Sequence, residues 1–121
     1  MTLVDTSAWI EALRTDGDSV LRSRVGALLE TGQAVLCDIV ILELWNGTRG
    51  GQERSKLRRI TETLDRVPTT QTVWKTANTL ATVCREKGVT VPATDLLVAA
   101  TARVHELDLL EADRHFRLIP D

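Results

Sequence analysis

Short apolar runs alternate along the chain with longer segments in which apolar residues recur at helical spacing. The short runs predict strands at 1–5, 33–37, 66–68, 107–110 and 118–119. The longer segments predict helices over 6–14, 19–30, 38–46, 52–64, 72–87 and 95–106. Because strands that alternate with helices pair in parallel, we expect an α/β fold whose sheet is covered on both faces.

The size and composition of the chain predict a single globular domain over residues 1–121. Apolar residues make up 43% and charged residues 26% of the sequence, as in ordinary globular proteins. No apolar stretch approaches the roughly 18 residues that a membrane span needs. The N-terminus also lacks the basic and apolar regions of a signal peptide. We therefore expect no membrane association and a cytoplasmic location.

The charge of the chain is unevenly distributed. The formal net charge is −2, but residues 49–66 carry a local charge of +3 and the remainder carries −5. A basic segment beside an acidic centre is compatible with a metal site that receives a polyanion. The alternative for the same segment is a solvated helix face.

Four carboxylates stand beside or inside apolar runs, where a surface acid is not expected: Asp5, Glu43, Asp95 and Asp113. Three of them border the ends of predicted strands or the start of a helix, and Glu43 interrupts an otherwise apolar helix. Ligands of parallel α/β folds bind beyond the carboxyl ends of the strands. Since all four acids can converge there, and a buried unpaired carboxylate is costly, the pattern predicts a shared hard cation.

Each acid also has a purely structural interpretation. Asp5 can act as a helix N-cap, and Asp95 can interact with a helix dipole. Asp113 can be a turn residue. Glu43 has no capping role, so its alternative is an ion pair with a buried arginine.

Oxygen-only ligation by carboxylates suits Mg²⁺ or Mn²⁺. Neither histidine, His105 or His115, is placed in the sequence in a way that predicts a zinc site. Ser7 would need a positioned histidine to act as a nucleophile. Glycine-rich nucleotide-binding motifs are absent.

Four pieces of the chain stand out by their order and spacing. They are Leu3-Val4-Asp5-Thr6-Ser7, Glu43 within a helix, the segment 93–102, and Ala112-Asp113-Arg114-His115-Phe116. Through them, and over essentially its full length, the chain resembles the PIN-domain nucleases, and more narrowly the VapC toxins of type II toxin–antitoxin systems. Two positions depart from the family pattern: Glu111 stands where relatives often have Thr, and His115 where they often have a second Asp.

The resemblance implies a PIN-like α/β/α sandwich with a parallel sheet of four to five strands. It also implies a catalytic pocket for one or two Mg²⁺ or Mn²⁺ ions, formed by Asp5, Glu43, Asp95 and Asp113. Thr6 or Ser7 matches the supporting hydroxyl beside the first acid. The implied activity is endoribonucleolytic: a metal-activated water attacks an RNA phosphodiester and leaves a 5′-phosphate and a 3′-hydroxyl.

The implied partners are an RNA substrate, a cognate VapB-like antitoxin and a second copy of the chain in a homodimer. Arg49, Arg54 and Arg58 are candidate contacts to the RNA backbone. Trp9, Leu13 and Trp45 are candidate parts of an antitoxin groove, and core packing explains them equally well.

Three other functions compete with this one. The first is a non-catalytic PIN-fold interaction module, which would have no need of four costly acids. The second is a phosphoryl-transfer receiver domain, but such a domain would have adjacent acids after the first strand and a late lysine, which this chain lacks. The third is a DNA nuclease of the same fold, which a comparison of substrates would separate from an RNA nuclease.

Overall fold

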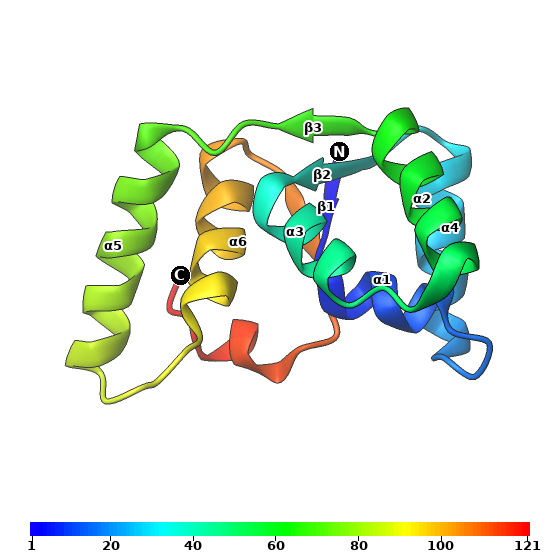
Figure 1. The fold of residues 1–121 in the computed structure, drawn as a ribbon. Coiled ribbons are helices and arrows are strands. Elements are labelled where there is room, and N and C mark those ends of the chain that lie inside the picture. Colours follow the sequence, from blue (N-terminus) through cyan, green and yellow to red (C-terminus); the bar gives the residue numbers. More distant parts are fainter.

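The computed structural model describes residues 1–121 and has one parallel sheet with helices on both of its faces (Figure 1). The sheet has the order β3-β2-β1-β4, and every pairing in it is parallel. Its strands are β1 (Thr2–Val4), β2 (Ala34–Cys37), β3 (Asp65–Val67) and β4 (Asp108–Leu110). The predicted α/β fold is therefore confirmed, with four strands.

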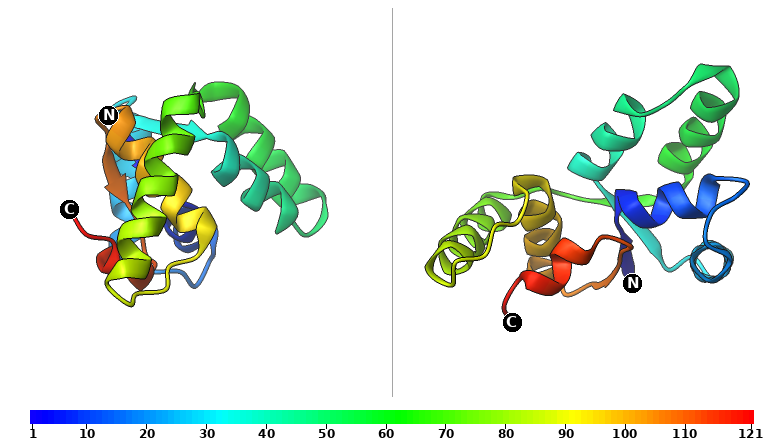
Figure 2. Two further views of the ribbon diagram at one scale, coloured as in Figure 1. Left: turned by 90° about the vertical axis from the view of Figure 1, so that its left-hand side faces the viewer. Right: turned by 90° about the horizontal axis from the view of Figure 1, so that it is seen from below.

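The connections between the strands are helical. They are α1 (Thr6–Leu13), α2 (Ser19–Glu30), α3 (Asp38–Asn46), α4 (Gly50–Thr63), α5 (Gln71–Glu86) and α6 (Ala93–Val104). Helices α1 and α2 pack together on one side of the sheet, and α5 and α6 pack together on the other (Figure 2). Helices α3 and α4 form a hairpin that extends away from the sheet (Figure 2). None of the six helices combines the length and the apolar character of a membrane-spanning segment.

The predicted final strand at 118–119 is wrong. Leu118 ends a short 3-10 helix, η1 (Arg114–Leu118), and the Ile119 N–H donates to the Phe116 carbonyl to close it. The turn begins because the Asp113 carboxylate accepts the His115 backbone N–H at 2.9 Å. Ile119 is buried with α5 and α6. Its apolar character therefore reflects packing against helices and not pairing in the sheet.

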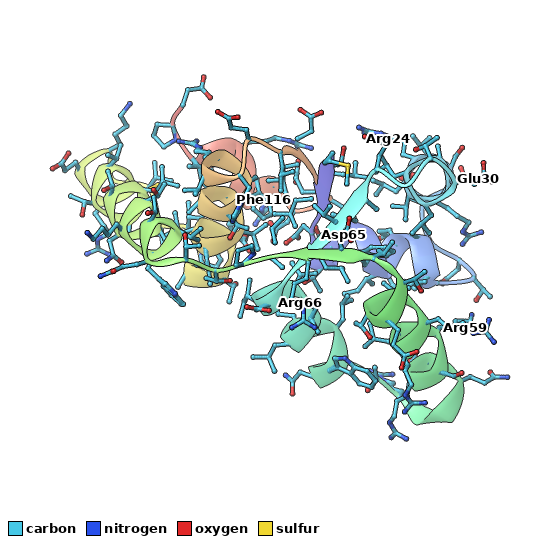
Figure 3. The ribbon with its side chains drawn as sticks, turned by 90° about the horizontal axis from the view of Figure 1, so that it is seen from above. Arg24, Glu30, Arg59, Asp65, Arg66 and Phe116 are labelled. Atoms are coloured by element: carbon cyan, nitrogen blue, oxygen red, sulfur yellow. The ribbon has the colours of Figure 1, made fainter.

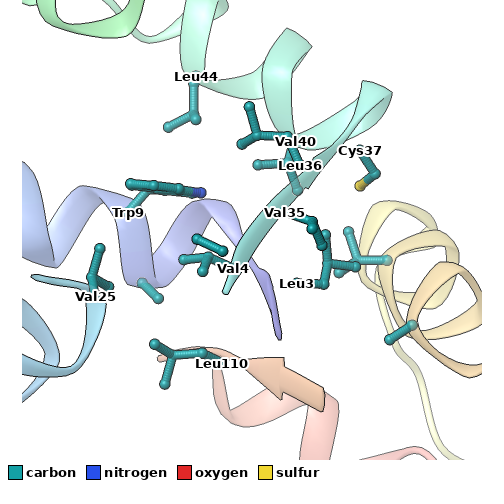
Figure 4. Close-up of a cluster of buried hydrophobic side chains, with 14 of the residues drawn as sticks. Leu3, Val4, Trp9, Val25, Val35, Leu36, Cys37, Val40, Leu44 and Leu110 are labelled. Atoms are coloured by element: carbon teal, nitrogen blue, oxygen red, sulfur yellow. The ribbon is translucent and has the colours of Figure 1, made fainter. Parts of the chain in front are cut away.

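The hydrophobic core consists of two clusters, and α6 contributes side chains to both of them. Val98 and Ala102 of α6 join the cluster between the strands and helices α1 to α4, part of which Figure 4 shows. Leu97 and Ala100 join a second cluster with α5. Residues 95–102 are consequently all buried, as the nearly continuous apolar pattern of this segment predicts.

Trp9 occupies the centre of the sheet cluster, near Leu44 of α3 and Val25 of α2 (Figure 4). Its side chain has no exposed surface. Trp9 therefore belongs to the core, which is one of the two roles that the sequence left open for it.

We expect Trp9→Ala to lower the free energy of unfolding by about 3–5 kcal/mol, because the surrounding side chains cannot fill the space that the indole leaves. Trp74→Ala is the matched control, since Trp74 is also helical but 52% exposed, and it should change stability by less than about 0.5 kcal/mol. Urea denaturation of the two variants measures both values. Equal losses would contradict the assigned core.

Candidate metal centre

Asp5 lies directly after β1 and serves as the N-cap of α1. Its Oδ2 accepts the Ser7 backbone N–H at 3.0 Å and the Ser7 hydroxyl at 2.6 Å. The residue is 4% exposed. Asp5 is therefore an N-cap, as the sequence allowed. The cap uses only one of its two carboxylate oxygens.

Glu43 reaches the same region from the second turn of α3. Its Oε1 accepts the Thr6 hydroxyl at 2.9 Å, so the first residue of α1 and the middle of α3 are tied together. No lysine or arginine forms an ion pair with Glu43 or with the other three predicted acids. The ion pair with a buried arginine, which was the structural alternative for Glu43, is therefore not formed.

Asp95 and Asp113 lie close together, and the third member of their group is His115, which the sequence did not predict. Asp95 lies in the first turn of α6 and is 8% exposed. The Nδ1 atom of His115 lies 2.6 Å from Asp113 Oδ1 and 3.7 Å from Asp95 Oδ2. One donor atom from each of these three residues falls within 4.8 Å of the other two.

The pKa values of these acids show that they share one environment. Burial is the largest cause that raises the pKa of Asp95 from its ordinary value of 3.8 to about 7, and the negative charges of Asp113 and Asp5 add to it. Burial likewise raises the pKa of Glu43, and the charge of Asp5 contributes again. Hydrogen bonds from His115 lower the pKa of Asp113. Asp5 therefore couples electrostatically to acids from both α3 and α6.

Ser7 also positions the loop that follows β4. The Ala112 backbone N–H donates to the Ser7 hydroxyl at 2.9 Å, and the same hydroxyl donates to Asp5. Beside Ala112, the Glu111 Oε2 atom is buried without a hydrogen-bond partner, so this carboxylate does not point into solvent. Thr6 and Ser7 thus connect the predicted acids on α3 and after β4 to the end of β1.

His115 is the functional candidate that the sequence analysis missed. The sequence did not indicate a histidine beside the carboxylates, but η1 brings the imidazole of His115 close to Asp113 and Asp95. An available signal was the Asp-x-His spacing at 113–115. An Asp that caps a turn two residues before a His can hold both side chains on one side of that turn.

The donor set fits a divalent cation. Asp95 Oδ2 is buried and has no hydrogen-bond partner, which is a costly state for a carboxylate oxygen unless a cation or proton satisfies it. Oxygen donors from several acids match the preference of Mg²⁺ and Mn²⁺. The structure brings donor atoms of Asp95, Asp113 and His115 within 4.8 Å of one another, and Asp5 and Glu43 are not part of this group.

Comparison with known proteins agrees with this geometry. The sequence matches the PIN domain family over residues 2–121. The chain belongs to the PIN domain family. It is 28% identical to the ribonuclease VapC11 of Mycobacterium tuberculosis, and the alignment covers 98% of this chain and 91% of that protein. The predicted resemblance to PIN domains and to VapC proteins is thereby confirmed.

Solved structures share the PIN fold of this chain. VapBC2 of Rickettsia felis, bound to a DNA fragment from its promoter, superposes with a TM-score of 0.81 at 20% identity and covers 98% of this chain and 92% of that one. VapC20 of Mycobacterium tuberculosis, a toxin that cleaves the sarcin–ricin loop, superposes with a TM-score of 0.70 at 20% identity and covers 97% and 93% of the two chains. At these identities the likeness establishes the fold alone.

The raised pKa of Asp95 predicts how stability depends on pH. Between about pH 4 and pH 7 the folded protein holds a proton on Asp95 that the unfolded chain has released, so stability must fall as the pH rises through this window. The raised pKa of Glu43 acts in the same direction. The pKa of Asp113 is lowered, so this residue makes stability depend on pH only below its ordinary pKa of 3.8, where stability falls as the pH falls.

We therefore expect the metal-free protein to lose on the order of 2 kcal/mol of unfolding free energy between pH 5 and pH 8. Urea denaturation in the presence of a chelator measures this slope. Asp95→Asn should remove most of it, and Asp16→Asn, in an exposed turn, is the matched control. A wild-type stability that stays flat or rises over this range would contradict the raised pKa of Asp95.

Proposed function

We propose that this PIN domain is a Mg²⁺- or Mn²⁺-dependent endoribonuclease that acts as the toxin of a toxin–antitoxin pair. The observation that carries the proposal is the buried Asp95 Oδ2 atom, which has no partner in a group of carboxylates without lysine or arginine. The names of the related ribonuclease VapC11 and of the toxin VapC20 support RNA as the substrate. We propose further that residues 1–121 act as a single nuclease domain in the cytoplasm.

In the proposed site, Asp5, Glu43, Asp95 and Asp113 hold one or two cations. When bound, such an ion would activate a water for attack on phosphorus and stabilise the charge that develops in the displacement. The acids themselves supply fixed negative charge, so the pocket repels the RNA phosphates until a cation is present. The buried position of Asp95 strengthens every electrostatic interaction at this point.

Thr6 and Ser7 act as positioning residues in this proposal. The Thr6 hydroxyl donates to Glu43 and leaves the second oxygen of that carboxylate free for a cation. Ser7 holds one oxygen of Asp5 and the backbone of Ala112, so the distance between β1 and the loop that carries Asp113 is constrained. Both hydroxyls reduce the motion of ligands that would otherwise repel each other.

The basic residues of α4 are the proposed contacts for the RNA backbone. Arg54 and Arg58 lie one helical turn apart and are both exposed, and α4 packs against the helix that carries Glu43. Arg66 is less available, because it pairs with Asp38 at 3.2 Å beside α3 (Figure 3). Arg49 donates its backbone N–H to Glu53 at the start of α4.

The proposed protein partners are a VapB-like antitoxin and a second copy of this chain. The VapBC2 structure from Rickettsia felis shares this fold, and so does a member of the VapBC family of toxin–antitoxin systems from Mycobacterium tuberculosis. Exposed apolar side chains on α1 and α3 would suit an apolar segment of an antitoxin: Ile10, Leu13 and Leu42. Trp45 is half-buried and packs against the sheet cluster.

The first test is cleavage of labelled structured RNAs with Mg²⁺, with Mn²⁺ or with a chelator. We expect metal-dependent cutting that Asp5→Asn and Glu43→Gln each reduce by at least roughly 100-fold, because each removes a cation ligand and its charge. Asp16→Asn and Glu86→Gln change exposed acids outside the site and are the matched controls.

The contrary outcome is also informative. A folded protein that neither binds Mg²⁺ or Mn²⁺ nor cuts a broad RNA panel would contradict the nuclease proposal and favour a non-catalytic interaction module. Cleavage of single-stranded DNA in preference to RNA would instead indicate a DNA nuclease of the same fold.

The proposed contacts of α4 with the RNA backbone can be tested by the salt dependence of RNA binding. Binding of single-stranded RNA in a chelator should weaken as salt increases, and Arg54→Ala/Arg58→Ala should make the slope of log K against log salt less steep by about 1.4, since two phosphate contacts are lost. Arg85→Ala/Lys87→Ala, at the exposed end of α5, is the control with the same charge change. An unchanged slope in the α4 variant would exclude these contacts.

A further inference from the structure

The imidazole of His115 stands inside the candidate metal centre and not merely beside it. Its Nδ1 atom faces Asp113 Oδ1 at 2.6 Å and Asp95 Oδ2 at 3.7 Å. All three donor atoms lie within 4.8 Å of one another. The Nδ1 atom is therefore close enough to both carboxylates to share a cation with them.

The local structure fixes this orientation. Asp113 caps η1 by accepting the His115 backbone N–H at 2.9 Å, so the two side chains emerge on the same side of the turn. Phe116, the next residue, packs against both hydrophobic clusters and anchors η1 to the core. The His115 side chain is 34% exposed and is thus accessible from solvent.

A second observation points to a ligand at this place. Asp95 is 8% exposed, and its Oδ2 atom is buried, faces His115 and accepts no hydrogen bond. Octahedral ligands about 2.1 Å from an ion lie about 3 Å apart when adjacent and about 4.2 Å apart when opposite. The distance of 3.7 Å lies between these values, and the contact of 2.6 Å would have to open slightly.

We propose that Nδ1 of His115 is a direct ligand of the divalent cation held by Asp95 and Asp113. The resulting mixed nitrogen and oxygen site would favour first-row transition ions such as Mn²⁺ and Co²⁺ over Mg²⁺. This inference rests on the metal dependence proposed above and narrows the class of metal. The hydrogen-bonding proton between Nδ1 and Asp113 Oδ1 would pass to solvent when the ion binds.

The chemical reason for the preference lies in the donor type. Imidazole nitrogen binds transition ions well, whereas Mg²⁺ is held by carboxylate, carbonyl and water oxygens. Replacing one carboxylate oxygen by a neutral nitrogen also removes a negative charge from the pocket. Both changes weaken Mg²⁺ binding more than Co²⁺ binding.

The competing interpretation is that His115 only neutralises Asp113 as an ion-pair partner. In that case a bound cation would have oxygen ligands alone. The two interpretations differ in whether a nitrogen nucleus is bonded to the metal, which pulsed electron paramagnetic resonance of bound Mn²⁺ detects directly through the ¹⁴N modulation of the spin echo.

The experiment loads the full chain with Mn²⁺ and records this spectrum for the wild type, His115→Asp and His105→Asn. We expect ¹⁴N modulation in the wild type and in His105→Asn, because the His105 ring contacts the Pro68 carbonyl and lies outside the metal centre. His115→Asp should still bind Mn²⁺ but lose the modulation. Calorimetric titration should show the preference for Co²⁺ over Mg²⁺ falling at least about tenfold in His115→Asp.

Three outcomes would overturn the proposal: wild-type protein that binds Mn²⁺ without ¹⁴N modulation, wild-type protein that binds no Mn²⁺, or modulation that survives in His115→Asp. The wild-type spectrum decides the question even if a variant does not fold. RNA cleavage by the same samples separates this proposal from the nuclease function. Cleavage without nitrogen ligation rejects only the role of His115, and nitrogen ligation without cleavage rejects only the nuclease function.

Discussion

The packing of α6 between the sheet and α5 determines the chemistry of the carboxylates. One side of α6 packs on the strands through Val98 and Ala102, and the other packs on α5 through Leu97 and Ala100. This packing carries Asp95, in the first turn of the helix, out of solvent. On an exposed helix the same carboxylate would remain hydrated and would titrate normally. Its raised pKa and its unpartnered oxygen both follow from the position of the helix.

The hydroxyl groups of Thr6 and Ser7 hold the segments at the edge of the sheet together. Thr6 binds Glu43, which is 37 positions away in sequence, and Ser7 binds Asp5 together with Ala112, which is 105 positions away from Ser7. One dipeptide after β1 thus contacts α3 and the loop after β4. Because short side chains lose little conformational entropy on ordering, they hold these segments with little opposing cost.

Like charges are concentrated in this region without a lysine or arginine to balance them. Such an arrangement lowers the stability of the metal-free protein, and functional sites are where proteins retain it. A cation that binds the folded state alone would recover this free energy, so metal affinity and stability are linked. Hydrogen bonds from His115 lower the pKa of Asp113, whereas burial is the largest cause that raises the pKa of Asp95.

Much of the fold followed from the sequence, because hydrophobic periodicity reports secondary structure. The alternation of short apolar runs with helical patterns predicted the parallel sheet, and the direction of parallel strands led us to expect the four acids at one edge. The apolar run at 118–119 misled the prediction, since burial against helices and burial in a sheet require the same residues. An N-cap at Asp113, with packing against α5 and α6, decided in favour of a 3-10 helix.

The sequence by itself determined which carboxylates are available and on which segments they stand. Only the tertiary structure decided that Thr6 reaches Glu43, that Asp95 loses its hydration and that His115 meets Asp95 across 20 positions of the chain. Local patterns encode the period of a helix or strand. Distances between remote side chains, and the dielectric environment that sets a pKa, arise only when the elements pack together.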